Sequence, residues 1–271
     1  MIIAGLGKAG VSIAKLFKPH TNNYKILTFD DGDGLEKKDT VEEYDAQQIK
    51  ITAKGLKSYS EGILFVCGSG KVAGATLRVL EALSSHQMKV VYIIPDLEFA
   101  SREEILRNKV HLGVLQQFAR SGRIQELILL DNKKLLKIAG SGPIKNYYER
   151  VNYFIYSMFQ NLNYCSNVEQ EFGSLHKTKE ISRISTISIA KLDDAEEKML
   201  YDLKNITESC YYFNIEEDDL NSDETILRTC QQIVRENIEK QRQSSFAIWL
   251  SSDDNNYFVK HHTHYIQEEN E

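Results

Sequence analysis

The sequence predicts an α/β protein, in which a helix-covered parallel sheet is joined through a long central helix to a smaller α/β domain. Three observations support this fold class. Short apolar runs alternate with helical patterns through the first half of the chain. Two of these runs end in glycine-rich turns, and residues 145–162 carry apolar side chains on all sides. We expect such a helix to be buried on most sides, as a spine between two domains would be.

Length and charge are those of a globular protein of two domains. The chain has 271 residues and a formal net charge of −6. This charge gives no overall attraction to nucleic acid or to an anionic membrane, so we expect neither as a partner. No apolar run reaches the roughly 18 residues that a membrane span needs, and no signal-peptide pattern is present. We therefore expect a cytoplasmic protein, with Cys67, Cys165, Cys210 and Cys230 reduced and mostly buried.

The chain opens with a strand and a glycine-rich turn that leads into a helix. The turn reads Gly5-x-Gly7-x-x-Gly10, and the inward face of the helix is expected to carry Val11, Ile13, Ala14 and Leu16 or Phe17. Glycines there let backbone N–H groups approach a phosphate, which a helix N-terminus also attracts. The next strand, residues 24–29, ends at Asp30, 20 residues after Gly10. Taken alone, these features match the fingerprint of a Rossmann-like dinucleotide site, so an NAD-dependent oxidoreductase is one hypothesis.

A second unit of strand, glycine loop and helix spans residues 63–83. Its loop contains Gly68, Gly70 and Gly74, and leucines follow at helical spacing. We interpret it as a second phosphate cradle, with a tight turn that binds no ligand as the alternative. The dinucleotide hypothesis does not explain this second loop, and the sequence shows no catalytic acid–base pair for it.

Further strands and helices follow in alternation. Residues 88–95 predict a strand, and residues 101–122 an amphipathic helix whose buried side would carry Ile105, Val110, Leu112 or Leu115, and Phe118. A strand at 126–130 ends in Asp131. The polar residues 32–60 predict a short helix or an irregular connection around 41–49.

The second half has mixed elements and no glycine-rich phosphate loop. It predicts a strand at 181–192, a helix at 196–206, a strand at 210–216, a helix capped by Ser222 or Asp223, and a terminal hairpin of residues 246–252 and 257–266. We interpret His261, His262 and His264 as solvent-facing residues of the last strand and predict no metal site.

With two glycine loops, a central helix and a following α/β domain, the chain resembles the tubulin/FtsZ superfamily over nearly its whole length. FVCGSGKVAGATLRVLEAL resembles that family's GGGTGTG phosphate loop, with Lys71 at the usual threonine. AGLGKAGVSIAKLF resembles the first nucleotide loop, and SGRIQELILLDNKKLL resembles a strand with an "IPNDRLL"-type end. The resemblance implies a nucleotide domain at 1–144, a central helix and loop at 145–177, and an activation-type domain at 178–271.

The resemblance also implies a guanine nucleotide, GTP or GDP, with Mg²⁺ as a candidate ion. It implies that the phosphates are bound by Gly5, Gly7, Lys8, Gly10, Gly68, Ser69, Gly70, Lys71, Val72, Ala73 and Gly74. Tyr148 falls where an aromatic ring stacks on the base, and Asn152 where guanine is read. Arg102, just past a strand, is a candidate for a ribose or phosphate contact, with a plain surface arginine as the alternative.

Two departures from the family bear on activity. In relatives, an acidic loop after the central helix activates water in the next subunit's site. Here Glu171 takes the first acidic place, but Ser174 takes the second, and a hydroxyl cannot polarise water as a carboxylate does. Residues 31–62 are too few for the γ-phosphate elements of relatives. The expected function is therefore guanine nucleotide binding and head-to-tail self-association into filaments, with slow or absent GTP hydrolysis.

Lys71 leaves a choice open. Its ammonium can neutralise phosphate charge in place of a metal ion, or it can occupy the phosphate position itself. The remaining alternative is a solvated loop lysine that contacts no ligand. The second case favours an alternative function, a nucleotide-free pseudo-GTPase that acts as a structural or regulatory partner of another protein. Lys8 raises the same choice.

Overall fold

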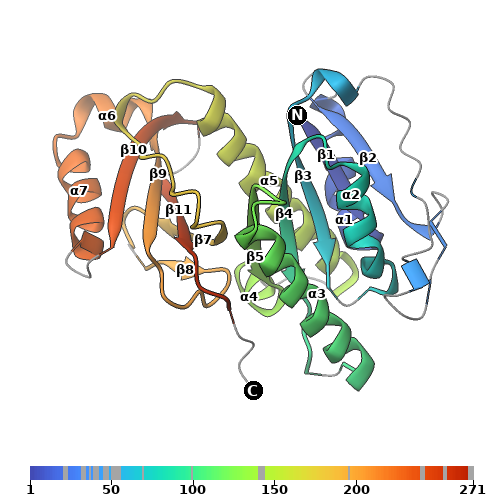
Figure 1. Ribbon diagram of the computed structural model, residues 1–271. Helices are drawn as coiled ribbons and strands as arrows, with labels where there is room; N and C mark the ends of the chain where they lie inside the picture. The colour runs from blue at the N-terminus through green and yellow to red at the C-terminus, as the bar shows by residue number, and fades with distance from the viewer. Residues whose placement is uncertain are drawn as a thin grey trace. The chain divides into compact units, whose positions relative to one another are not determined.

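The structure is a computed structural model (Figure 1). It describes residues 1–20, 24–31, 35–36, 38, 43–44, 49, 56–68, 70–98, 100–139, 144–194, 196–238, 242–252 and 255–267. The chain divides into two compact units, Met1–Ser157 and Met158–Gln267. The division falls inside the long helix that the sequence analysis treats as a separate connecting element.

The first unit contains a parallel sheet of five strands, which confirms the predicted class. Its order is β2-β1-β3-β4-β5, with β1 at Ile2–Leu6, β2 at Lys25–Phe29, β3 at Glu61–Cys67, β4 at Gln87–Ile94 and β5 at Glu126–Asp131. Strand β1 is buried along its whole length, and β3 and β5 are buried along most of theirs. Such continuous burial is typical of a parallel sheet with both faces covered.

Helices connect these strands (Figure 1). They are α1 at Gly7–Leu16, α2 at Thr76–Ala82, α3 at Arg102–Arg120, α4 at Asn132–Ile138 and α5 at Tyr147–Asn167, with short 3₁₀ helices η1 at Lys18–His20, η4 at Leu56–Ser58, η5 at Lys71–Ala75 and η6 at Ile144–Asn146. The inward face predicted for the first helix is confirmed, and Phe17 rather than Leu16 completes it. Most of the connection predicted around 41–49 lies outside the described residues.

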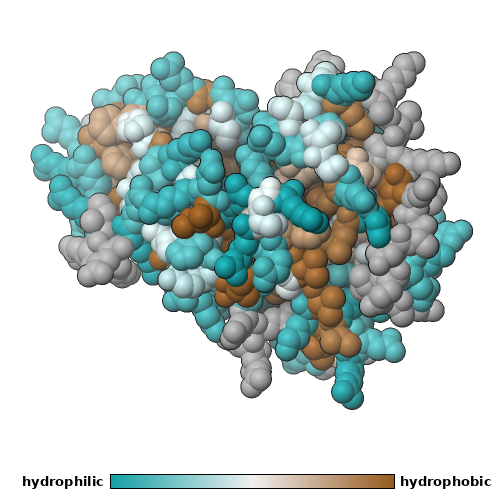
Figure 2. All heavy atoms as spheres, in the orientation of Figure 1, coloured by the Kyte–Doolittle hydropathy of each residue, from teal (hydrophilic) through white to brown (hydrophobic). Residues whose placement is uncertain are grey.

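The predicted buried face of helix α3 is confirmed only in part, because Leu112 and Leu115 are buried and Phe118 is half-buried, whereas the other two predicted residues are exposed. Ile105 and Val110 are 39% and 45% exposed, and Leu106 is 61% exposed. Figure 2 shows hydrophobic atoms gathered on the surface over this helix. The buried face also includes polar residues, because Asn108 is held inside by a 2.8 Å hydrogen bond from the Tyr92 hydroxyl. A hydrophobicity pattern cannot predict a buried amide whose partner lies on another element.

Helix α5 also differs in part from its prediction. It buries Val151, Ile155, Met158 and Phe159. Tyr148 and Tyr153, however, are 71% and 60% exposed, so the helix is not buried on most sides. Tyrosine has an apolar ring and a polar tip, and a run of tyrosines therefore looks more apolar in sequence than the helix surface is.

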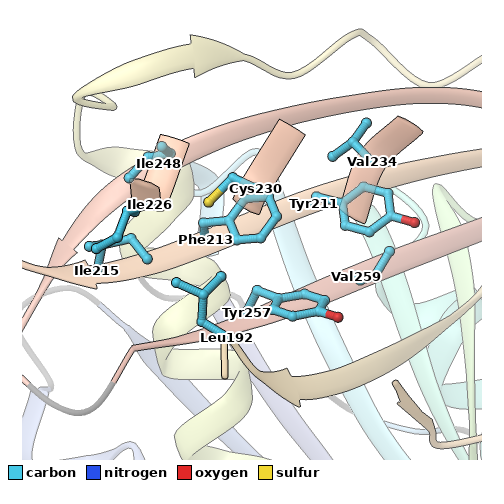
Figure 3. Packing of buried hydrophobic residues seen from close by; sticks show 10 residues of the cluster. All are labelled: Leu192, Tyr211, Phe213, Ile215, Ile226, Cys230, Val234, Ile248, Tyr257 and Val259. Atoms are coloured by element: carbon cyan, nitrogen blue, oxygen red, sulfur yellow. The ribbon is translucent and has the colours of Figure 1, made fainter. Parts of the chain in front are cut away.

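The second unit contains a mixed sheet on which buried apolar side chains pack in separate clusters. The sheet order is β7-β11-β9-β10-β6, with β6 at Phe172–Ser174, β7 at Ile184–Lys191, β9 at Glu208–Glu216, β10 at Gln243–Ser251 and β11 at Asn256–Thr263; β8 at Lys198–Met199 pairs with β7. Helices α6 at Glu217–Ser222 and α7 at Thr225–Ile238 follow β9. Residues of α7 pack on side chains of β9, β10 and β11, as Figure 3 shows.

Two predictions for this unit are wrong. Strands β10 and β11 do not form a hairpin, because β9 lies between them, parallel to β10 and antiparallel to β11. The reason is that α7 connects β9 to β10 and packs its apolar face on the sheet. A helical connection of this kind joins parallel strands, so β10 pairs with β9. The predicted helix at 196–206 is absent. In its place β8 pairs with β7, the Leu200 N–H donates to the Ile187 carbonyl at 2.9 Å, and Leu200 is buried. Capping by Asp223 is confirmed, since its carboxylate accepts from the Thr225 N–H at 2.8 Å.

A third prediction, that three histidines of the last strand face solvent, is wrong for His261 and His262 of β11, and His264 follows the strand and is half-buried. His261 and His262 are 1% and 5% exposed, because β11 is an interior strand between β7 and β9. The ring of His261 lies 2.9 Å from Ser209 Oγ and 3.0 Å from Ser188 Oγ. No group of three or more metal-ligating side chains occurs among the described residues.

Glu208, at the start of β9, is fully buried and well bonded. Its carboxylate accepts hydrogen bonds from Ser182 Oγ at 2.7 Å and from the Lys179 N–H at 3.1 Å, and lies 3.2 Å from His176 Nε2. Burial alone raises the pKa of Glu208, but these hydrogen bonds outweigh burial and hold the pKa below its usual value. Glu208 therefore stays ionised at neutral pH.

Candidate functional site

A pocket of about 480 Å³ lies in the first unit, where β1, β2 and β3 end. In a parallel α/β sheet, ligands bind at the carboxyl ends of the strands. The described residues that line the pocket are Leu6, Gly7, Lys8, Ala9, Ser12, Asp30, Cys67, Gly70, Lys71, Val72, Ala73, Tyr148 and Asn152. Both predicted glycine turns thus contribute to one pocket, together with the start of α5.

The first turn supplies the N-terminus of α1. Gly7 has a φ of +70°, a conformation that favours glycine, and the helix begins there. No side chain caps this N-terminus, so its first N–H groups are left to water or to a ligand. Gly5 and Gly10 do not line the pocket. A Cβ at Gly10 would overlap the Phe65 carbonyl, and a Cβ at Gly5 the backbone of Gly10, so these two glycines let α1 pack closely on β1 and β3.

The second turn supplies another helical N-terminus. Helix η5 begins at Lys71 after Gly70, again with no side-chain cap. Gly68 directly follows β3 and does not line the pocket. A Cβ at Gly68 would overlap the Tyr92 hydroxyl, and the Gly68 N–H donates to the Ile93 carbonyl at 3.0 Å. Gly74 is buried and outside the pocket lining, and Ser69 lies outside the described residues.

The charges of the pocket favour an anion. Two helical N-termini, each with partial positive charge, meet there with the exposed Lys8 and Lys71. Asp30 is the one carboxylate among the described lining residues. Uncapped N–H groups and lysines together form the kind of site that binds phosphate.

Helix α5 adds an aromatic ring and an amide. Tyr148 and Asn152 are four residues apart, which places them on one face of the helix. The ring of Tyr148 is 71% exposed and contacts Tyr147 edge to face at 5.3 Å. A flat ring beside an amide can hold a heterocyclic base by stacking and hydrogen bonding.

This arrangement was compared with known proteins. No protein-family model and no curated protein matches the sequence. Solved structures do match: FtsZ of M. jannaschii has a TM-score of 0.66 at 12% identity, with 97% of this chain and 87% of that chain covered. CetZ of Methanosaeta thermophila strain DSM 6194 gives 0.69 at 11%, with 97% and 86% covered. A GTPγS-form protofilament of Bacillus thuringiensis serovar israelensis TubZ gives 0.64 at 14%, also with 97% and 86% covered.

The chain has the tubulin/FtsZ fold. The predicted resemblance is thereby confirmed at the level of architecture. At 11–14% identity these likenesses concern the fold alone, so the function has to be argued from the pocket.

Besides Gly5, Gly10, Gly68 and Gly74, two further predicted site residues of this tubulin/FtsZ-fold chain are not in the pocket. Arg102 is the first residue of α3, is exposed and does not line the pocket. Glu171 belongs to the second unit, where it is exposed and its N–H donates to the Ile248 carbonyl at 2.8 Å. Its neighbour Ser174 ends the short strand β6.

Several residues that line the site or contact it were missed by the sequence analysis, among them Leu6 and Ala9 of the lining. Ser12 lines the pocket one helical turn after Lys8, a spacing that the sequence already displays. Cys67 lines it as the last residue of β3. The Tyr44 hydroxyl donates a hydrogen bond to the Lys71 carbonyl in the second loop. Tyr44 lies in a polar segment of the sequence where no pattern marks it.

The fit of a divalent cation can be judged from the donor set. A protein-held Mg²⁺ site takes oxygen ligands, often from one or two carboxylates with bound phosphates and water. Among its described residues, the pocket provides Asp30 and Ser12 for this, beside two lysines. Any Mg²⁺ here would depend on oxygens of the ligand more than on those of the protein.

Proposed function

We propose that the pocket binds a guanine nucleotide, GTP or GDP, and that the nucleotide-bound chain associates head to tail into filaments. One observation carries the nucleotide part of this proposal. Two uncapped helical N-termini, two lysines, an aromatic ring and an amide line the same pocket. Its volume of about 480 Å³ lies within the range of small-molecule sites.

The amide of Asn152 can hydrogen-bond the edge of a purine, because an asparagine side chain both donates and accepts hydrogen bonds. An amide pairs with the N–H and carbonyl groups of guanine and also with the amino group and ring nitrogen of adenine. The choice of guanine therefore follows the resemblance to the tubulin/FtsZ superfamily. Tyr148 is indifferent to the base, because every base has a face on which an aromatic ring can stack.

Filament formation is supported by the neighbours in structure. Two of them are described as protofilaments and as a two-stranded filament of TubZ. A head-to-tail contact uses two different surfaces and does not close, so it propagates. The proposal places this assembly in the cytoplasm as a cytoskeletal protein. The part of the chain that the structure describes contains no helix fit to cross a membrane.

Hydrolysis is proposed to be slow or absent. In the expected assembly, residues 169–174 of one subunit meet the nucleotide of the next. Glu171 then takes the first acidic place, but Ser174 takes the second. A hydroxyl cannot polarise water as a carboxylate does.

Nucleotide identification in the purified protein tests this proposal. Denaturation followed by ion-exchange chromatography and mass spectrometry should release GDP or GTP. Recovery of NAD would instead support the oxidoreductase hypothesis, which Asp30 in the pocket lining favours. Recovery of nothing, with no binding of added GTP, would support the pseudo-GTPase hypothesis, in which Lys71 occupies the phosphate position.

Binding and assembly are then measured separately. Lys8→Ala should weaken GDP binding about 10- to 100-fold, as loss of a charge-assisted hydrogen bond does. Lys109→Ala, an exposed lysine of α3 outside the pocket, is the matched control. Sedimentation with and without GTP reports assembly; a protein that binds GTP but stays monomeric would refute the filament part alone.

A further inference from the structure

The hydroxyl group of Tyr44 connects two parts of the first unit. Tyr44 is 1% exposed and lies between β2 and β3 in sequence. Its oxygen accepts a hydrogen bond from the Lys38 N–H at 2.9 Å and donates one to the Lys71 carbonyl at 3.2 Å. Tyr44 itself is not among the residues that line the pocket.

The bond to Lys71 constrains the next peptide N–H. In a trans peptide, the C=O of one residue and the N–H of the next lie in one plane and point in opposite directions. No cis peptide bond occurs among the described residues. A Lys71 carbonyl held toward Tyr44 therefore turns the Val72 N–H to the other side. Val72 lines the pocket, as do Gly70, Lys71 and Ala73.

The start of this loop has no side-chain cap, and a Cβ at Gly70 would meet nothing within 4 Å. Its backbone is held by a hydrogen bond from the Ala73 N–H to the Gly70 carbonyl at 2.9 Å. Hydrogen bonds of a 3₁₀ helix have poorer geometry than those of an α-helix. Farther along, the Thr76 hydroxyl binds the Ala73 carbonyl at 2.5 Å. Tyr44 thus provides a side-chain hydrogen bond at the end of the loop nearest the proposed phosphates.

We propose that Tyr44 is a positioning residue of the phosphate site, which holds the peptide between Lys71 and Val72 so that the Val72 N–H faces the phosphates. This inference rests on the proposed nucleotide function. A donor that is already oriented before binding loses less free energy when the ligand arrives. The effect of Tyr44 is therefore confined to the phosphate part of the ligand.

The test compares GDP with guanosine on Tyr44→Phe, which removes the hydroxyl and keeps the ring. Guanosine has the base and ribose without phosphates, and its affinity is measured by displacement of a fluorescent GDP analogue. Tyr44→Phe should bind GDP roughly 3- to 10-fold more weakly, the effect of one lost hydrogen bond. Its affinity for guanosine should stay within about twofold of the wild type, because Tyr148 and Asn152 are unchanged.

Tyr24→Phe is the matched control, since Tyr24 is a buried tyrosine of the same unit outside the pocket lining. It should bind both ligands as the wild type does. Equal weakening of GDP and guanosine in Tyr44→Phe, or no change in either, would overturn the positioning role. If the proposed nucleotide function is wrong, the wild-type protein will bind neither GDP nor guanosine. This result is distinct from the outcomes that overturn the role of Tyr44.

Discussion

Asn152 follows Tyr148 by one turn of α5, and both side chains line the pocket that also contains the two glycine turns. The two residues come from one rigid element, so their relative position does not depend on a loop. A base held by one of them is therefore within reach of the other.

Replacement of Tyr148 tests the stacking part of this pair. Tyr148→Ala should weaken GDP binding about 10-fold, the lower part of the range for base–aromatic stacking, because the ring is 71% exposed. Tyr153→Ala is the control, an α5 tyrosine that is 60% exposed and outside the pocket lining. Isothermal calorimetry measures both. Equal affinities of the two variants would contradict the assignment of Tyr148.

Cys67 offers a chemical probe of the pocket. It is half-buried and lines the pocket, whereas Cys165, Cys210 and Cys230 are buried. A thiol reagent such as DTNB should therefore react with Cys67 in a fast first phase, and saturating GDP should slow this phase at least several-fold. The Cys67→Ser variant should lack the fast phase. A labelling rate that GDP leaves unchanged would contradict the placement of the nucleotide.

His111 should make stability depend on pH. It is 3% exposed, and neither ring nitrogen has a hydrogen-bond partner. Burial, and then the charge of Arg107, lower the pKa of His111 to about 4 from 6.5. Between these values the unfolded chain binds the proton and the folded chain does not. The free energy of unfolding should therefore decrease by about 3 kcal/mol as the pH is lowered through this range.

Urea unfolding at pH 7, 5.5 and 4.5 measures this change. The free energy of unfolding should be nearly constant well above pH 6.5, decrease between the two pKa values, and level off below about pH 4. His111→Leu should lack this part of the pH dependence, because leucine does not titrate. The expectation is wrong if the two proteins lose stability in parallel over this range.

Glu208 should stabilise the second unit through its charge. Glu208→Gln should lower the free energy of unfolding by roughly 1–3 kcal/mol at pH 7, since it loses hydrogen bonds to a charged acceptor. The pKa of Glu208 is lowered in the fold, so its contribution is present above about pH 4.5 and is lost as the pH falls further. The difference from the wild type should thus shrink at pH 4. Glu180→Gln, an exposed glutamate near the same segment, should cost little at either pH.

Elements whose side chains make local patterns were predictable. The parallel strands of the first unit, the inward face of α1 and the cap by Asp223 all follow from neighbours in sequence. Strand order in the second unit was not predictable, because β9 enters between β10 and β11 from an earlier part of the chain. The same placement buries His261, whose position in the last strand had suggested an exposed edge.

By itself, the sequence determined that two glycine turns, a central helix and a second α/β region follow one another, since periodicity and glycine placement are local properties. Only the tertiary structure decided which of those glycines face a ligand. Gly7 and Gly70 line the pocket, while Gly5, Gly10 and Gly68 provide room for close packing. It also decided that Tyr44 meets Lys71, 27 residues later, because a hydrogen bond between distant residues depends on the path of the whole chain and leaves no local pattern.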